Sequence, residues 1–168
     1  MHNVSELSDV LFNQESAGDS TTVDIDGVSL VVYKDDTTVR IYPKNSSLHS
    51  SYEFSATITL DGYVEMSIQA KDSSGNRLPG FYAKEFASLA ISYLQQRNAI
   101  RGIKGVWRRN TGISDNFKTF SLHWFQKRDG VEAAKQTWTG KLALSLGYSH
   151  VHISTEDPSY IHAYFSAE

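Results

Sequence analysis

The chain of 168 residues contains no cysteine, only three prolines and no apolar run long enough to cross a bilayer, which takes about 18 residues. Without cysteine there is no disulfide, no thiolate metal ligand and no cysteine nucleophile. We therefore expect no membrane-spanning helix, and the N-terminus lacks the basic and then apolar pattern of a secretion signal. These absences fit a cytoplasmic protein, and they fit equally an exported effector without disulfides.

Hydrophobic residues make up 40% of the chain and charged residues 21%, which is typical of a soluble globular protein. The net charge of −3 argues against a broad nucleic-acid-binding surface, although a local basic cluster stays open. The length suits one domain over residues 21–168, preceded by a polar tail or short helix over residues 1–20.

The first half of the chain alternates apolar and polar residues with period two, the pattern of half-buried strands. We expect four strands there, over residues 28–33, 39–43, 54–60 and 63–70. Asp61-Gly62 is a strong hairpin signal between the last two. The pattern therefore predicts an antiparallel meander.

The second half changes to helical spacing. We expect a helix from Phe81 to Arg97, a strand over residues 99–107, and a helix that is capped at Ser114-Asp115 and ends at Asp129-Gly130. A further helix is predicted over residues 131–146, with Val131, Ala134, Trp138 and Leu142 inward and Gly147 as its stop. Strands over 150–154 and 160–165 close the chain. The order predicts an α+β fold: a mixed, mostly antiparallel, twisted sheet with helices on both faces.

The turn between the strand ending at Ala70 and the helix opening near Phe81 is a candidate phosphate site, because backbone N–H groups converge at a helix N-terminus. The sequence of this turn is Arg77-Leu-Pro-Gly80-Phe81-Tyr82-Ala83. Together with the element order, it resembles the GNAT superfamily of acetyl-CoA-dependent N-acyltransferases, whose turn reads Arg/Gln-x-x-Gly-x-Gly/Ala. Tyr82 stands where that family has a small residue.

The GNAT resemblance covers residues 28–165 and implies a GNAT-like core with acetyl-CoA as cofactor. It implies that Arg77, Gly80, Phe81, Tyr82 and Ala83 hold the pyrophosphate, and that Asn110, after the next strand, is a further cofactor contact. The acceptor would be an amine on a small molecule or a protein.

Acyl transfer to an amine needs a base, and the departing thiolate benefits from a hydroxyl donor. Glu65, on the strand before the turn, is the candidate base, with a solvated strand carboxylate as the structural alternative. Tyr148 stands where the family often has a hydroxyl donor; the alternative is a buried core aromatic.

Three further motifs follow in the second half: Ile103-x-Gly-x-Trp107, Ser114-Asp-Asn-x-x-x-Phe120 and Thr137-x-Thr-Gly-Lys141-x-Ala-x-x-x-Gly147-Tyr148. They resemble the C-terminal domains of bacterial polymorphic toxins and haemagglutinin-like exoproteins. The resemblance implies a bacterial effector or toxin-related domain and attaches no definite activity to it. The basic cluster Lys104, Arg108 and Arg109 could take RNA phosphates while Trp107 stacks on a base, or it could be a solvated strand end.

The last two strands carry three histidines, with His150 and His152 on one strand face and His162 expected across from His152. Such a group could bind zinc, serve a metal-independent nuclease with Arg108 stabilising the phosphorane, or lie unused on the surface. We predict no metal. No Walker loop, EF-hand loop or Gly-x-Ser-x-Gly elbow occurs.

The sequence thus leaves three hypotheses. The first is an N-acyltransferase using acetyl-CoA. The second is a toxin-type effector with a GNAT-like fold that acts on RNA. The third is a non-catalytic immunity or binding protein with a protein partner.

Overall fold

The computed structural model describes residues 3–14, 18–109 and 115–167, and within these ranges the chain forms eight strands and six helices. The chain separates into two compact units. Unit 1 comprises Met1–Ile58 and Met66–Ile100, and unit 2 comprises Thr59–Glu65 and Arg101–Glu168. Strand β5 (Tyr63–Gln69) contributes residues to both. The predicted α+β class with mostly antiparallel strands is confirmed.

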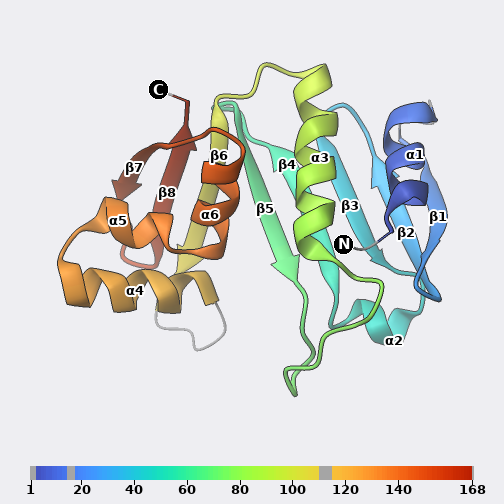
Figure 1. Cartoon of the computed structure of the whole chain (residues 1–168), viewed down its shortest axis with the longest axis horizontal. Helices are drawn as coiled ribbons and strands as arrows, with labels where there is room; N and C mark the ends of the chain where they lie inside the picture. Colours follow the sequence, from blue (N-terminus) through green and yellow to red (C-terminus); the bar gives the residue numbers. More distant parts are fainter. Residues whose placement is uncertain (1–2, 15–17, 110–114, 168) are drawn as a thin grey trace. The chain divides into compact units, whose positions relative to one another are not determined.

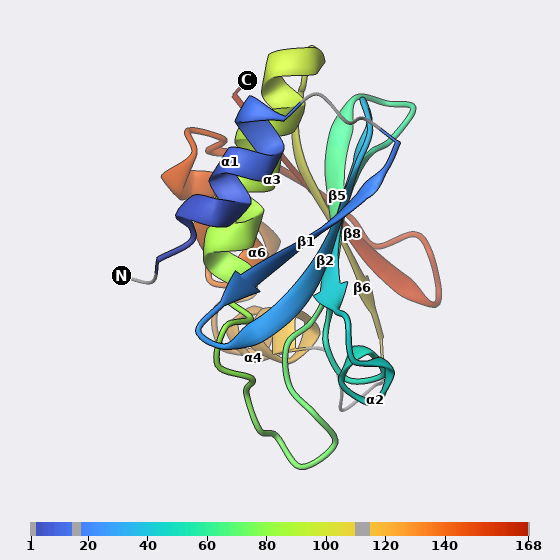
Figure 2. The same ribbon diagram turned by 90° about the vertical axis from the view of Figure 1, so that its right-hand side faces the viewer.

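Unit 1 is built on an antiparallel meander of β1 (Ser20–Ile25), β2 (Val28–Lys34), β3 (Thr38–Pro43) and β4 (Glu53–Ile58). Helices α1 (Ser5–Asn13) and α3 (Ala83–Arg97) lie together on one face of these strands (Figure 1, Figure 2). That face carries the alternate, fully buried residues of the strands: Leu30, Val32, Val39, Ile41, Phe54 and Ala56. Burial of these side chains is the main source of stability in the unit.

The single-turn helix α2 (Ser46–His49) lies against the other face of the meander, since its His49 stacks on Tyr42 of β3 with ring centroids 4.3 Å apart. Strand β1 was not predicted as a separate strand. Its hairpin with β2 turns at Asp26-Gly27, where both residues have positive φ (49° and 82°). Asp-Gly is the same hairpin signal as Asp61-Gly62, so the sequence did contain the information.

Unit 2 holds a second group of strands in the order β5, β6 (Gly102–Arg108), β8 (Tyr160–Ser166) and β7 (His150–Ser154). Residues 63–65 of β5 pair with β6 in parallel, whereas β6, β8 and β7 pair antiparallel. Helices α4 (Asp115–Lys127), α5 (Gly130–Lys135) and α6 (Trp138–Ser145) cover one face of this sheet (Figure 1). Beneath them lie the buried residues Val64, Ile103, Trp107, Ile161, Ala163 and Phe165.

The single helix predicted over residues 131–146 is wrong, because α5 ends at Lys135 and α6 begins at Trp138. Thr137 separates them: its hydroxyl accepts the Gly140 N–H at 2.9 Å, an N-cap that competes with continuing the helix. The break also turns Val131 and Trp138 outward, each 37% exposed, although both were predicted to point inward. Ala134 and Leu142 are buried as predicted.

Candidate functional site

The predicted phosphate turn belongs to unit 1, and the N–H groups of Gly80 and Phe81 are bonded within the protein. Gly80 is buried with φ +93°, and a Cβ at this position would lie 2.3 Å from the Ile25 carbonyl oxygen. The Phe81 N–H donates to the Leu78 carbonyl at 3.0 Å. The Gly80 N–H donates to the Tyr82 hydroxyl, which itself donates to the Asp26 carboxylate.

The side chains of this turn are also largely engaged. The Asp26 carboxylate raises the pKa of Tyr82, because it accepts a hydrogen bond from the protonated phenol. Phe81 is buried, with its ring 5.9 Å from Tyr52 and 5.2 Å from Phe86 between centroids. Arg77 is exposed and Ala83 is the first residue of α3, whereas Asn110 lies outside the described residues.

The two candidate catalytic residues both belong to unit 2 but have different surroundings. Glu65 is half-buried on β5, opposite Lys104 of β6. Tyr148 is buried just after α6, where its N–H donates to the Ala143 carbonyl at 2.9 Å. Neither side chain lines the cavity described next.

The face of the unit 2 sheet away from α4, α5 and α6 carries polar and aromatic side chains, and we call it the open face. Strand alternation sets its membership, since residues two apart share a face. The register pairs Lys104 with Tyr164 and Tyr164 with His152, and in the neighbouring row it pairs Gly102 with Ser166 and Ser166 with His150. Residues from β5, β6, β8 and β7 thus meet in rows across this face.

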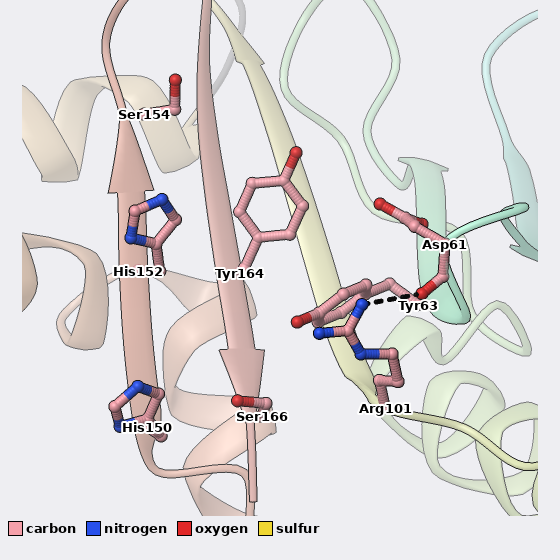
Figure 3. A pocket seen from close by; sticks show the side chains of 8 residues that line it. All are labelled: Asp61, Tyr63, Arg101, His150, His152, Ser154, Tyr164 and Ser166. Carbon is pink, nitrogen blue, oxygen red and sulfur yellow. Dashed lines mark hydrogen bonds between the residues drawn. The ribbon is translucent and has the colours of Figure 1, made fainter. Parts of the chain in front are cut away.

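A cavity of about 570 Å³ lies on the open face (Figure 3). It is lined by eight residues: Asp61, Tyr63, Arg101, His150, His152, Ser154, Tyr164 and Ser166. Three rings stand side by side in it. The Tyr63 and Tyr164 centroids are 5.2 Å apart at an edge-to-face angle of 70°, and the His152 ring lies 6.0 Å from Tyr164.

Two cations border these rings. The guanidinium of Arg101 lies 5.1 Å from the Tyr63 ring centroid, and the ammonium of Lys104 lies 5.2 Å from that of Tyr164. Arg101 Nη1 donates to the Asp61 carbonyl at 3.4 Å, a long hydrogen bond, and Lys104 Nζ is 3.9 Å from Asp61 Oδ2. Burial raises the pKa of the Asp61 carboxyl, but the Thr59 hydroxyl and Lys104 outweigh it, and the pKa is lowered.

The predicted basic cluster is only partly brought together: strand alternation puts Lys104 and Arg108 on one face of β6, whereas Trp107 lies on the other face. Trp107 points to the helix-covered face, where its ring packs 5.6 Å from Phe120, and it is only 4% exposed, so it cannot stack on a base. Arg109 Nη2 donates to the Thr155 carbonyl at 2.7 Å, which fixes Arg109 in the β7–β8 turn. Arg108 lies opposite Tyr160 at the far end of β6, away from the cavity.

The histidines are arranged differently from the prediction. His150 and His152 do share one face of β7 and both line the cavity. His162 is opposite Ser154, not His152, and its Nε2 is 3.2 Å from Asp157 Oδ2. Over the described part of the chain, no three His, Asp or Glu side chains are grouped as metal ligands.

Sequence reasoning missed Tyr63, Arg101 and Tyr164, which form the centre of the cavity. A signal existed for Tyr164, since Tyr160, His162, Tyr164 and Ser166 alternate with buried apolar residues in β8. Nothing comparable marked Arg101, because it precedes β6 and reaches the cavity through the pairing of β6 with β5.

No family model, curated protein or solved structure matches the chain. The GNAT and toxin resemblances therefore stay predictions. No helix in the described residues is both long and apolar enough to span a bilayer.

Proposed function

We propose that unit 2 binds single-stranded RNA on its open face, as an effector domain of the kind that the second hypothesis describes. The observation that carries this proposal is the group of three rings, Tyr63, Tyr164 and His152, in one cavity that Arg101 also lines, with the Lys104 ammonium over the Tyr164 ring. Unpaired bases stack on aromatic side chains, and neighbouring cations neutralise the phosphates between them.

The charge distribution supports the same function. Unit 2 has nine Lys and Arg against eight Asp and Glu, a net charge of +1, whereas the whole chain has −3. A near-neutral unit with two cations beside a ring cluster suits a short segment of RNA better than a long duplex, whose binding needs many phosphate contacts.

The acetyl-CoA hypothesis has less support from the geometry. A diphosphate at the 77–83 turn would need the N–H groups that Tyr82 and Leu78 already bind. It would also need room at Gly80, where the Ile25 carbonyl lies against the backbone.

The test is a fluorescence anisotropy titration of the full chain with a labelled single-stranded RNA of about 20 nucleotides that contains every dinucleotide step. Tyr164→Ala should weaken binding about tenfold, because one stacked base is lost. Lys104→Ala should weaken it less and reduce the dependence of log Kd on log salt by about 0.7, the value of one phosphate contact to a single strand.

The matched control is Lys118→Ala, which removes the same charge from α4, on the helix-covered side of the same unit. Its affinity should equal that of the wild type. Thermal melts verify that each variant is folded. An unchanged affinity in Tyr164→Ala, or an equal loss in Lys118→Ala, would contradict the proposal.

A further inference from the structure

We infer that His150 and His152 cleave the RNA bound on the open face, acting as a proton-transfer pair without a metal ion. This inference rests on the proposed function and adds a reaction to it. It starts from the placement of two imidazoles at successive same-face positions of one strand, both in the wall of the cavity that holds the ring cluster (Figure 3).

The spacing of the two histidines suits one phosphodiester. Residues two apart on a strand have Cα atoms about 7 Å apart, so two imidazoles on one face can approach a phosphate from either side. Both side chains are exposed, which leaves room for the backbone of a nucleic acid. His150 belongs to the row of Ser166 and His152 to the row of Tyr164, so a base stacked on Tyr164 would bring its own phosphate to the histidines.

The reaction is an internal transesterification. The 2′-hydroxyl oxygen of the RNA attacks the adjacent phosphorus while a neutral imidazole takes the hydroxyl proton. The bond between phosphorus and the 5′-oxygen of the next nucleotide breaks, and the other histidine, as imidazolium, gives its proton to that oxygen. The products are a 2′,3′-cyclic phosphate and a free 5′-hydroxyl, with no net change in protons.

Arg101 is the cation best placed to stabilise the extra negative charge on the pentacoordinate phosphorus. It lines the same cavity, next to the Gly102–Ser166–His150 row, and the hydrogen bond that its Nη1 donates to the Asp61 carbonyl is long at 3.4 Å. Its guanidinium can therefore turn to a phosphate at little cost. The sequence had suggested Arg108 for this role, but Arg108 does not line the cavity.

The test incubates the full chain with the same labelled RNA in excess EDTA and identifies the product ends by mass spectrometry. We expect 2′,3′-cyclic phosphate ends from the wild type. The rate should fall at least about 100-fold in His150→Ala and in His152→Ala. His123→Ala, a histidine of α4 outside the cavity, is the matched control and should cleave like the wild type. An oligonucleotide with 2′-deoxyribose throughout should stay intact.

Binding measured in parallel separates the two proposals. RNA that is bound but left uncut would overturn this inference and leave the proposed function standing. RNA that is neither bound nor cut would overturn both. Cleavage of the 2′-deoxy strand, or cleavage that survives in both histidine variants, would overturn the mechanism.

Discussion

The two units share a design but use their polar residues in opposite ways. Each has a sheet with its longer helices on one face. In unit 1, which has seven Lys and Arg against eleven Asp and Glu, the polar groups away from the helices pair with one another. Arg40 bonds Glu53, and His49 stacks on Tyr42. In unit 2 the corresponding face has a cavity with two imidazoles and an arginine in its wall.

The contrast extends to the one turn that the sequence marked as a phosphate site. In unit 1 the N–H groups of Gly80 and Phe81 are bonded by the chain itself. A helix start after a glycine turn is therefore not enough for a binding site, because the turn can serve to pack its own unit.

Gly80→Ala should destabilise the protein by about 3 kcal/mol, because the new methyl group adds a clash to backbone strain. The Cβ would lie 2.3 Å from the Ile25 carbonyl oxygen, and φ is +93°. Gly75→Ala is the matched control: its φ is +82°, but nothing lies within 4 Å of the added Cβ. It should cost only about 1 kcal/mol. Urea denaturation measures both, and equal losses would show that Gly80 is not a packing contact.

Lys34→Met should lower the free energy of unfolding by about 2 kcal/mol, because it leaves carbonyl groups at the end of α1 without a donor. Lys34 is 2% exposed, and its Nζ donates to the carbonyls of Val10 at 2.6 Å, Leu11 at 3.2 Å and Gln14. Burial, and to a lesser extent Arg97, lower its pKa. Lys44→Met, at an exposed position, should have little effect in the same urea experiment. A stabilised Lys34→Met would mean that burying the charge costs more than its hydrogen bonds contribute.

Tyr82→Phe should cost about 1 kcal/mol, the loss of one hydroxyl that bridges the Gly80 N–H and Asp26. The substitution also leaves the Gly80 N–H without its phenol acceptor. Acetyl-CoA at millimolar concentration should leave the melting temperature of the wild type unchanged. A ligand that binds adds about 2.7 kcal/mol to the free energy of unfolding at 100 times its Kd, so binding would be visible as a shift. A clear shift in the wild type would support the acyltransferase hypothesis and would mean that this turn of unit 1 does bind a ligand.

Local patterns in the sequence predicted most of the fold. Alternation predicted the strands of unit 1 after β1, and helical spacing predicted α3 and α4 nearly to their ends. The break at Thr137 was missed because a threonine is compatible with a helix interior, and only the packing of Gly140 against the Ala134 carbonyl requires the cap there.

The candidate site was harder to predict because it depends on register. His150 and His152 were recognised from their spacing, but the expected partner, His162, lies two residues along β8 from Tyr164, which faces His152. A difference of two residues moves a side chain about 7 Å along the strand, enough to replace a three-histidine group by His152 beside Tyr164. The role of Lys34 was not predicted either, because a lysine before Asp35-Asp36 has the pattern of an exposed turn. In the structure its ammonium instead bonds the Val10 carbonyl of α1.

The most direct test of the open face is an NMR titration that follows the ring signals of the histidines and tyrosines while single-stranded RNA is added. We expect the largest shifts in the ring signals of His150, His152, Tyr63 and Tyr164, and no shift in those of Tyr82 and Tyr52 in unit 1. Shifts that are confined to Tyr82 and its neighbours, or no shifts at all, would contradict it.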